Sequence, residues 1–100
     1  MILQIFEYPG VTEEQYEAAV RGVNFGGEMP EGGLVHIAGP MEGGWRVIDV
    51  WESQEDFDRF HEEHLASAQS SQGYGLPEKI HTYEVHSVFT HGRWRHGANE

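Results

Sequence analysis

Four segments of the chain are short runs rich in apolar, β-branched and aromatic residues, whereas two segments between them repeat apolar residues every three or four positions. Runs of the first kind are typical of strands, and the period of three to four residues is typical of amphipathic helices. Strands are therefore expected at residues 2–8, 34–39, 45–52 and 80–90, and helices at residues 12–23 and after Ser53. Segments rich in glycine, proline and serine separate these elements and predict loops.

Capping residues mark where both predicted helices begin. Thr12 is followed by Gln15 at the spacing of a capping box, and Ser53 is followed by Asp56 three residues later. The apolar stripe of the second helix consists of Phe57, Phe60, Leu65 and Ala68. The segment SSQGYGLPEK then ends this helix, because its glycines, proline and serines favour a turn.

The order of the elements, βαββαβ, predicts a ferredoxin-like α+β fold. In this fold a four-stranded antiparallel sheet carries both helices on one face. We expect one domain over residues 1–90 and a polar C-terminal tail at residues 91–100. A chain of 100 residues is long enough to bury the core of one such domain.

The third predicted strand is apolar on both of its sides. Successive side chains alternate, so Val47, Asp49 and Trp51 lie on one face of the sheet, while Ile48 and Val50 lie on the other. We expect Ile48 and Val50 to face the helices. The face without helices would then carry Leu34, Ala38, Trp45, Val47 and Trp51.

A contiguous apolar surface of this kind is rarely left in contact with water. A second copy of the chain can cover it in a symmetric, face-to-face dimer. We therefore expect a homodimer in which the two sheets form an α/β barrel. In the alternative arrangement, the tail or a longer loop folds over the sheet of a monomer.

Composition and charge exclude several classes of function. The chain has no cysteine, so disulfides, thiolate nucleophiles and cysteine metal sites are excluded. The formal net charge of −11 argues against a nucleic-acid partner, since binding to phosphates requires lysine and arginine. The chain has no long apolar run, and its first residues lack the basic segment and cleavage site of a signal peptide. We expect a cytoplasmic protein with no membrane partner.

His36 and Asp49 are the first candidates for chemistry. In the simplest hairpin register these two residues are neighbours on one face of the sheet. Burying a histidine and a carboxylate among apolar groups is costly unless they pair or border a polar cavity. In such a pair the carboxylate orients the imidazole and supports it as a general base. Alternatively, the two side chains satisfy each other and do no more than hold the strand register.

The last predicted strand has two amphipathic rows, and either row could face the helices. If the row that contains Tyr83 packs on the helices, Glu84 and His86 join His36 and Asp49 on the opposite face. His86 would then be a second titratable group in the same chamber. The two histidines and the aspartate could also resemble a metal-binding set, but their spacing is not diagnostic of one. We expect no metal.

Four segments resemble the dimeric α/β-barrel superfamily, whose small members include antibiotic biosynthesis monooxygenases and many uncharacterised actinobacterial proteins. The segments are EYPGVTEEQYEA, LVHIAGP, GGWRVIDVWESQEDFDRF and YEVHSVF, and the third is the most specific. The resemblance implies a face-to-face dimer with a chamber between sheet and helices or at the mouth of the barrel. It also implies reactions such as cofactor-free oxygenation of polyketide-like phenols, isomerisation, cyclisation or haem degradation, and the fold alone does not choose among them.

Together, these observations predict a homodimer that binds a small apolar or aromatic molecule without a cofactor. His36 is expected to act as base or hydrogen-bond donor, Asp49 to orient it and His86 to serve as a second acid. The ligand-binding residues are expected to be Phe6, Trp45, Trp51 and Glu84. An enzyme of this kind would abstract a proton from a polyketide-like or aromatic substrate, with cyclisation or oxygenation to follow. The alternative is a non-catalytic binding or structural homodimer.

Overall fold

The helices and strands follow the predicted order in the computed structural model, which describes residues 1–23 and 27–90 and the backbone of residues 93–96. The strands are β1 (Ile2–Pro9), β2 (Gly33–Met41), β3 (Gly44–Trp51), β4 (Ile80–Glu84), β5 (Ser87–Thr90) and β6 (Arg93–His96). The helical segments are α1 (Glu13–Val23), α2 (Gln54–Phe60), a π-helical turn (His61–Leu65) and α3 (Ala66–Ser70). In the described residues, no helix is long and apolar enough to span a membrane.

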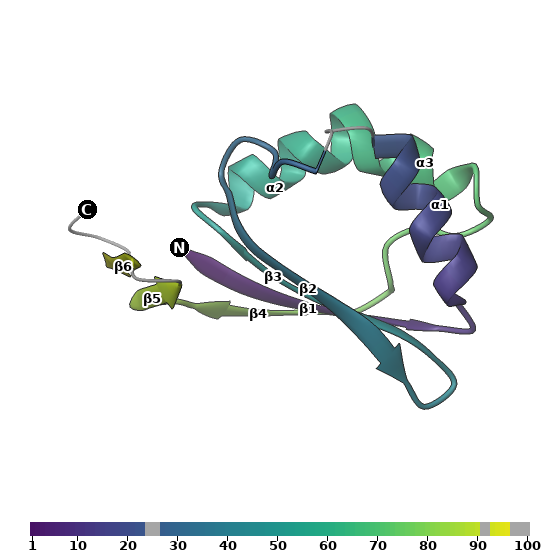
Figure 1. The fold of residues 1–100 in the computed structure, drawn as a ribbon, viewed down its shortest axis with the longest axis horizontal. Helices are drawn as coiled ribbons and strands as arrows, with labels where there is room; N and C mark the ends of the chain where they lie inside the picture. Colours follow the sequence, from purple (N-terminus) through teal and green to yellow (C-terminus); the bar gives the residue numbers. More distant parts are fainter. Residues whose placement is uncertain (24–26, 91–92, 97–100) are drawn as a thin grey trace.

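The predicted ferredoxin-like α+β fold is confirmed. Four strands form an antiparallel sheet in the order β2-β3-β1-β4. Helix α1 and the segment from α2 to α3 lie together on one face of this sheet, and no described helix covers the other face (Figure 1). The sheet and the helices are therefore two layers, and the core lies between them.

Both capping residues act as predicted. The Gln15 backbone N–H donates to the Thr12 hydroxyl (3.1 Å), and the Thr12 N–H donates to the Gln15 side-chain oxygen (2.9 Å). The Asp56 N–H donates to the Ser53 hydroxyl at 3.1 Å. These bonds satisfy amide groups that the first turn of a helix leaves without a partner, so they set where α1 and α2 begin.

A π-helical turn joins α2 and α3 into one long helical segment. The Ala66 N–H donates to the carbonyl oxygen of His61, five residues earlier, instead of four as in an α-helix. One extra residue in a turn rotates everything after it by roughly 100° relative to a regular helix. With this rotation, Gln69 lines the cavity beneath α3, next to Ala68 of the predicted stripe, which is also buried.

The assignment of the two faces of the sheet was wrong. Val47 and Trp51 face the helices and form the core with Phe6 and Phe57, and Asp49 points to the same side. Alternation separates two rows but does not say which row is covered, and here both rows are apolar. The row with the tryptophans is covered because Trp51 packs against the aromatic side chains of α2 and Trp45 packs against Tyr16 of α1.

The face without helices nonetheless carries many apolar residues, although His81 and the ion pair of Glu7 with Arg46 also lie on it. Residues that pair directly across neighbouring antiparallel strands share a face, so the strand register identifies its members. It carries Leu3, Ile5, Val35, Ile37, Ile48, Val50 and Tyr83. Ile37 and Tyr83 are each 56% exposed in the single chain.

The predicted strand at residues 80–90 is interrupted. β4 pairs with β1, whereas β5 pairs with β6 in a separate two-stranded sheet that extends beyond the end of the main sheet (Figure 1). Between them, the Val85 N–H donates to the Met1 carbonyl oxygen at 2.9 Å. The expected tail thus contains a strand at residues 93–96, while residues 91–92 and 97–100 lie outside the described residues.

Candidate functional site

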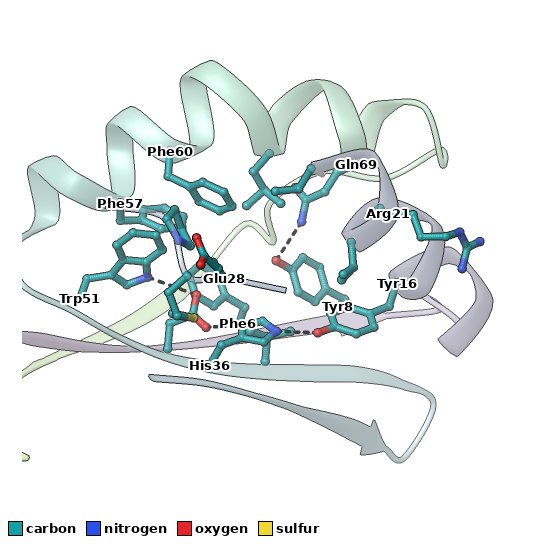
Figure 2. A pocket seen from close by; sticks show the side chains of 18 of the residues that line it. Phe6, Tyr8, Tyr16, Arg21, Glu28, His36, Trp51, Phe57, Phe60 and Gln69 are labelled. Atoms are coloured by element: carbon teal, nitrogen blue, oxygen red, sulfur yellow. Dashed lines mark hydrogen bonds and ion pairs between the residues drawn. The ribbon is translucent and has the colours of Figure 1, made fainter. Parts of the chain in front are cut away.

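A cavity of about 630 Å³ lies between the sheet and the helices. Figure 2 shows side chains from the strands below it and from the helices above it converging on this space. Its lining is mainly aromatic and aliphatic, with a small number of polar groups, as is usual for sites that bind small molecules. The residues used below are Phe6, Tyr8, Tyr16, His36, Val47, Asp49, Trp51, Phe57, Phe60, Leu65, Gln69 and Tyr74.

A chain of hydrogen bonds crosses the floor of the cavity. Because β2 and β3 pair His36 directly with Asp49, both side chains point to the helix side. His36 Nδ1 lies 2.7 Å from Asp49 Oδ1, and the Trp51 indole N–H donates to Asp49 Oδ2 at 3.2 Å. His36 Nε2 lies 2.5 Å from the hydroxyl oxygen of Tyr16, which is on α1 (Figure 2).

These contacts determine where the protons are. Asp49 is 6% exposed and accepts at both oxygens, so the Nδ1 atom of His36 carries the proton that it donates to Asp49. His36 Nε2 therefore presents a lone pair that accepts the Tyr16 O–H. Burial, with the negative charges of Glu17 and Asp49, raises the pKa of Tyr16 to about 12. Tyr16 is thus a neutral donor at neutral pH.

Aromatic side chains in tilted and edge-to-face contacts form one wall of the cavity. The ring centroid of Trp51 lies 5.5 Å from that of Phe57 and 5.3 Å from that of Phe60. The ring centroids of Phe6 and Phe57 are 5.4 Å apart. These separations are typical of favourable aromatic pairs. The wall is therefore rigid and apolar, and it suits a flat hydrophobic ligand.

Tyr8, Gln69 and Tyr74 form a second polar group at the cavity, which we call the distal cluster. The Gln69 side-chain N–H donates to the Tyr8 hydroxyl at 3.1 Å, and the ring of Tyr74 packs edge-on against that of Tyr8. Burial raises the pKa of both tyrosines above the ordinary value, and the Gln69 amide partly offsets the rise. Both hydroxyls therefore stay protonated.

The structure brings four of the predicted site residues to the cavity. They are Phe6, His36, Asp49 and Trp51. Trp45 lies next to the cavity instead, in the core, with its ring centroid 5.2 Å from that of Tyr16.

Glu84 and His86 do not reach the cavity. Glu84 shares a face with Asp49 by register, but it is exposed at the end of β4 and is not part of the lining. His86 is exposed in the connection between β4 and β5, away from the pair of His36 and Asp49. In the part of the chain that the structure describes, no three metal-ligating side chains are grouped to hold an ion.

Sequence reasoning missed Tyr16, Tyr8 and the two other members of the distal cluster. Tyr16 belongs to the apolar stripe of the first helix, and its hydroxyl among apolar side chains could have indicated a polar contact in the core. The sequence gave no indication for Gln69, because no sequence pattern predicts the π-helical turn that directs its side chain inward.

Comparison with known proteins agrees with this fold. No protein-family model matches the sequence, and no curated protein matches it. A solved structure from Chloroflexus aurantiacus J-10-fl, of a protein named for the antibiotic biosynthesis monooxygenases, superposes with a TM-score of 0.58 and 16% identity. The match covers 92% of this chain and 98% of that one. The two proteins therefore share a fold.

Proposed function

We propose that the protein binds a small aromatic molecule in this cavity and removes an acidic proton from it, with His36 as the base. The observation that supports this proposal is the series of hydrogen bonds from Asp49 through His36 to Tyr16, which lies at an otherwise aromatic and aliphatic cavity. The apolar wall would bind the ring system of the ligand. The hydrogen-bonded chain would receive its proton.

The proton moves in two linked transfers. The ligand hydroxyl donates to the Tyr16 oxygen, while Tyr16 passes its own proton to His36 Nε2 at the other side of the 2.5 Å contact. The ligand O–H bond breaks, the Tyr16 O–H bond is restored and His36 becomes an imidazolium. Asp49, already bonded to Nδ1, stabilises that positive charge. The ligand remains as a phenolate or enolate, from which cyclisation or oxygenation can proceed.

The second part of the proposal is a homodimer formed through the sheet face that no described helix covers. This face carries the seven apolar residues identified above by register, in strands β1 to β4. A standard protein interface buries about 1,600 Å² in total, and apolar burial stabilises by roughly 25 cal/mol per Å². A second copy would remove the exposed side chains of Ile37 and Tyr83 from water.

One observation favours a non-catalytic alternative. Both ring nitrogens of His36 already have partners, so the histidine could serve only to connect α1 to β3. This alternative predicts that a ligand binds without changing its protonation state. The two functions are therefore separated by the ionisation of a bound phenol.

The experiment uses 4-nitrophenol, whose anion absorbs at a longer wavelength than its neutral form. The wild-type protein is titrated with the probe over a pH series, and the apparent pKa of the bound probe is read from its spectrum. We expect that pKa to be lower than that of the free probe by about one unit or more, because the anion forms beside an imidazolium.

His36→Gln should abolish this lowering while leaving binding measurable. Glutamine keeps a polar side chain at the position but cannot accept the proton. His64→Gln is the matched control, since His64 is exposed on the π-helical turn and is not part of the cavity lining. A bound probe that ionises equally in wild type and in His36→Gln would support the non-catalytic alternative.

A further inference from the structure

We propose that the distal cluster of Tyr8, Gln69 and Tyr74 is a second binding subsite, which recognises an uncharged acceptor oxygen such as a ketone carbonyl. The ligand would then be an aromatic molecule with an acidic hydroxyl at one end and a carbonyl at the other. This inference rests on the proposed function and narrows its substrate class.

Three separate segments bring the cluster together. Tyr8 follows Phe6 on the helix side of β1, and the π-helical turn directs Gln69 toward it from above (Figure 2). The turn after α3 is held by a bond from the Tyr74 N–H to the Gln69 carbonyl oxygen (3.2 Å). Gln15 on α1 also donates to the Gln72 carbonyl oxygen at 2.9 Å. The cluster is therefore supported from both helical segments.

In both orientations of the Gln69 amide, the cluster leaves a hydrogen-bond donor without an acceptor among the described residues. Gln69 is 3% exposed and donates one N–H to Tyr8, and no described residue accepts the Tyr8 proton or pairs with the Gln69 amide oxygen. If the amide rotates so that its oxygen accepts the Tyr8 O–H, its own N–H groups lose their acceptor instead. In either arrangement a buried N–H or O–H of Tyr8 or Gln69 stays unpaired, and such a group is costly unless a ligand oxygen accepts from it.

The acceptor must be uncharged. Both tyrosines remain protonated and donate, but they supply no positive charge, and Asp49 places a negative charge on the same cavity. Arg21 contributes to the rim, but its guanidinium points away from the cavity in Figure 2. A carboxylate at the distal cluster would thus be buried without a cation, whereas a carbonyl oxygen would be satisfied by the O–H or N–H donors alone.

Two probes that differ in one group test the inference. 4-Hydroxybenzophenone and 4-benzylphenol share a phenol and a second ring, and only the first has a carbonyl in place of a methylene. The measurement is the ratio of their dissociation constants in wild type and in Tyr8→Phe. The two phenols also differ in acidity, which affects binding through His36. This effect on the ratio of dissociation constants is the same in wild type and in Tyr8→Phe, so it cancels when the two ratios are compared.

We expect the wild type to prefer the ketone and Tyr8→Phe to reduce this preference about fivefold, the usual value of one neutral hydrogen bond. Tyr74→Phe provides a second test at the same cluster, in case Tyr8→Phe does not fold. Tyr83→Phe is the matched control, because it removes a tyrosine hydroxyl that lies outside the cavity, on the opposite face of the sheet, which we assign to the homodimer. That variant should leave the ratio unchanged.

Failure of this inference differs from failure of the proposed function. If both probes bind and ionise through His36 but their ratio is the same in wild type, Tyr8→Phe and Tyr74→Phe, the distal subsite is refuted and the proposed function stands. If 4-nitrophenol and both probes fail to bind, the proposed function and the distal subsite are both refuted. A shift of the ratio in Tyr8→Phe or Tyr74→Phe, with none in Tyr83→Phe, supports the subsite.

Discussion

Replacing Asp49 by asparagine should separate stability from proton abstraction. In the wild type, Asp49 accepts from His36 Nδ1 at 2.7 Å and from the Trp51 indole at 3.2 Å. Asparagine has one acceptor oxygen, and Trp51 is 1% exposed, so the indole N–H would keep that oxygen. The asparagine NH2 group would then donate to His36 Nδ1. This arrangement moves the imidazole proton to Nε2, where it faces the Tyr16 hydroxyl and removes the lone pair that acts as base.

The cost in stability follows from the same contacts. Asp49→Asn exchanges two hydrogen bonds to a charged acceptor for two neutral ones, which we estimate to cost about 1–2 kcal/mol. Asp49→Ala leaves the buried Trp51 N–H without a partner and should cost about 3 kcal/mol. For a domain of this size, each kcal/mol corresponds to a decrease of roughly 4–8 °C in melting temperature.

Urea unfolding at one fixed protein concentration and 4-nitrophenol ionisation check both effects. Asp49→Asn should abolish the ionisation of the bound probe while unfolding at a slightly lower urea concentration, and Asp49→Ala should be the less stable of the two. Asp58→Asn is the control, since the exposed side chain of Asp58 accepts from the side chain of Gln54 and its replacement should change stability by less than about 0.5 kcal/mol. The reasoning is refuted if Asp49→Asn ionises the probe as the wild type does, or if Asp49→Ala is as stable as Asp49→Asn.

Three further predictions concern the rest of the molecule. The folded-state pKa of Tyr16, about 12, lies above the ordinary value of 10.0, so the unfolded chain loses this proton first and stability should fall as pH rises from 10 toward 12. Alkaline urea titrations of wild type and Tyr16→Phe should show a smaller fall in the variant. Ile37→Glu should convert the dimer to a particle of 11.4 kDa in sedimentation, whereas Ser70→Glu, at an exposed position of α3, should not. A monomeric wild type would contradict the dimer. Deleting Glu63 should be tolerated, because it converts the π-helical turn to a regular α-helical turn. Deleting Glu17 from α1 should instead rotate the following residues by roughly 100° and lower the melting temperature strongly. Equal melting temperatures for the two deletions would contradict this interpretation.

Local patterns along the chain determined the elements and their order. The capping pairs at Thr12 and Ser53 predicted where the helices begin, because a cap involves residues only three positions apart. The hairpin also predicted that His36 and Asp49 are neighbours, since the register of a short hairpin depends on its own residues. These features depend on short-range geometry, so the sequence alone was sufficient for them.

Tertiary packing decided what local patterns leave open. Both faces of β3 carry apolar residues, and only the packing of Trp51 against α2 and of Trp45 against α1 determined which face the helices cover. The π-helical turn brought Gln69 to the cavity, and the break after Glu84 left His86 outside it. Each of these outcomes depends on contacts between residues far apart in the chain. Strand alternation and helical period indicate only which side chains lie on the same face of an element. Packing between the sheet and the helices decides which of those faces is buried.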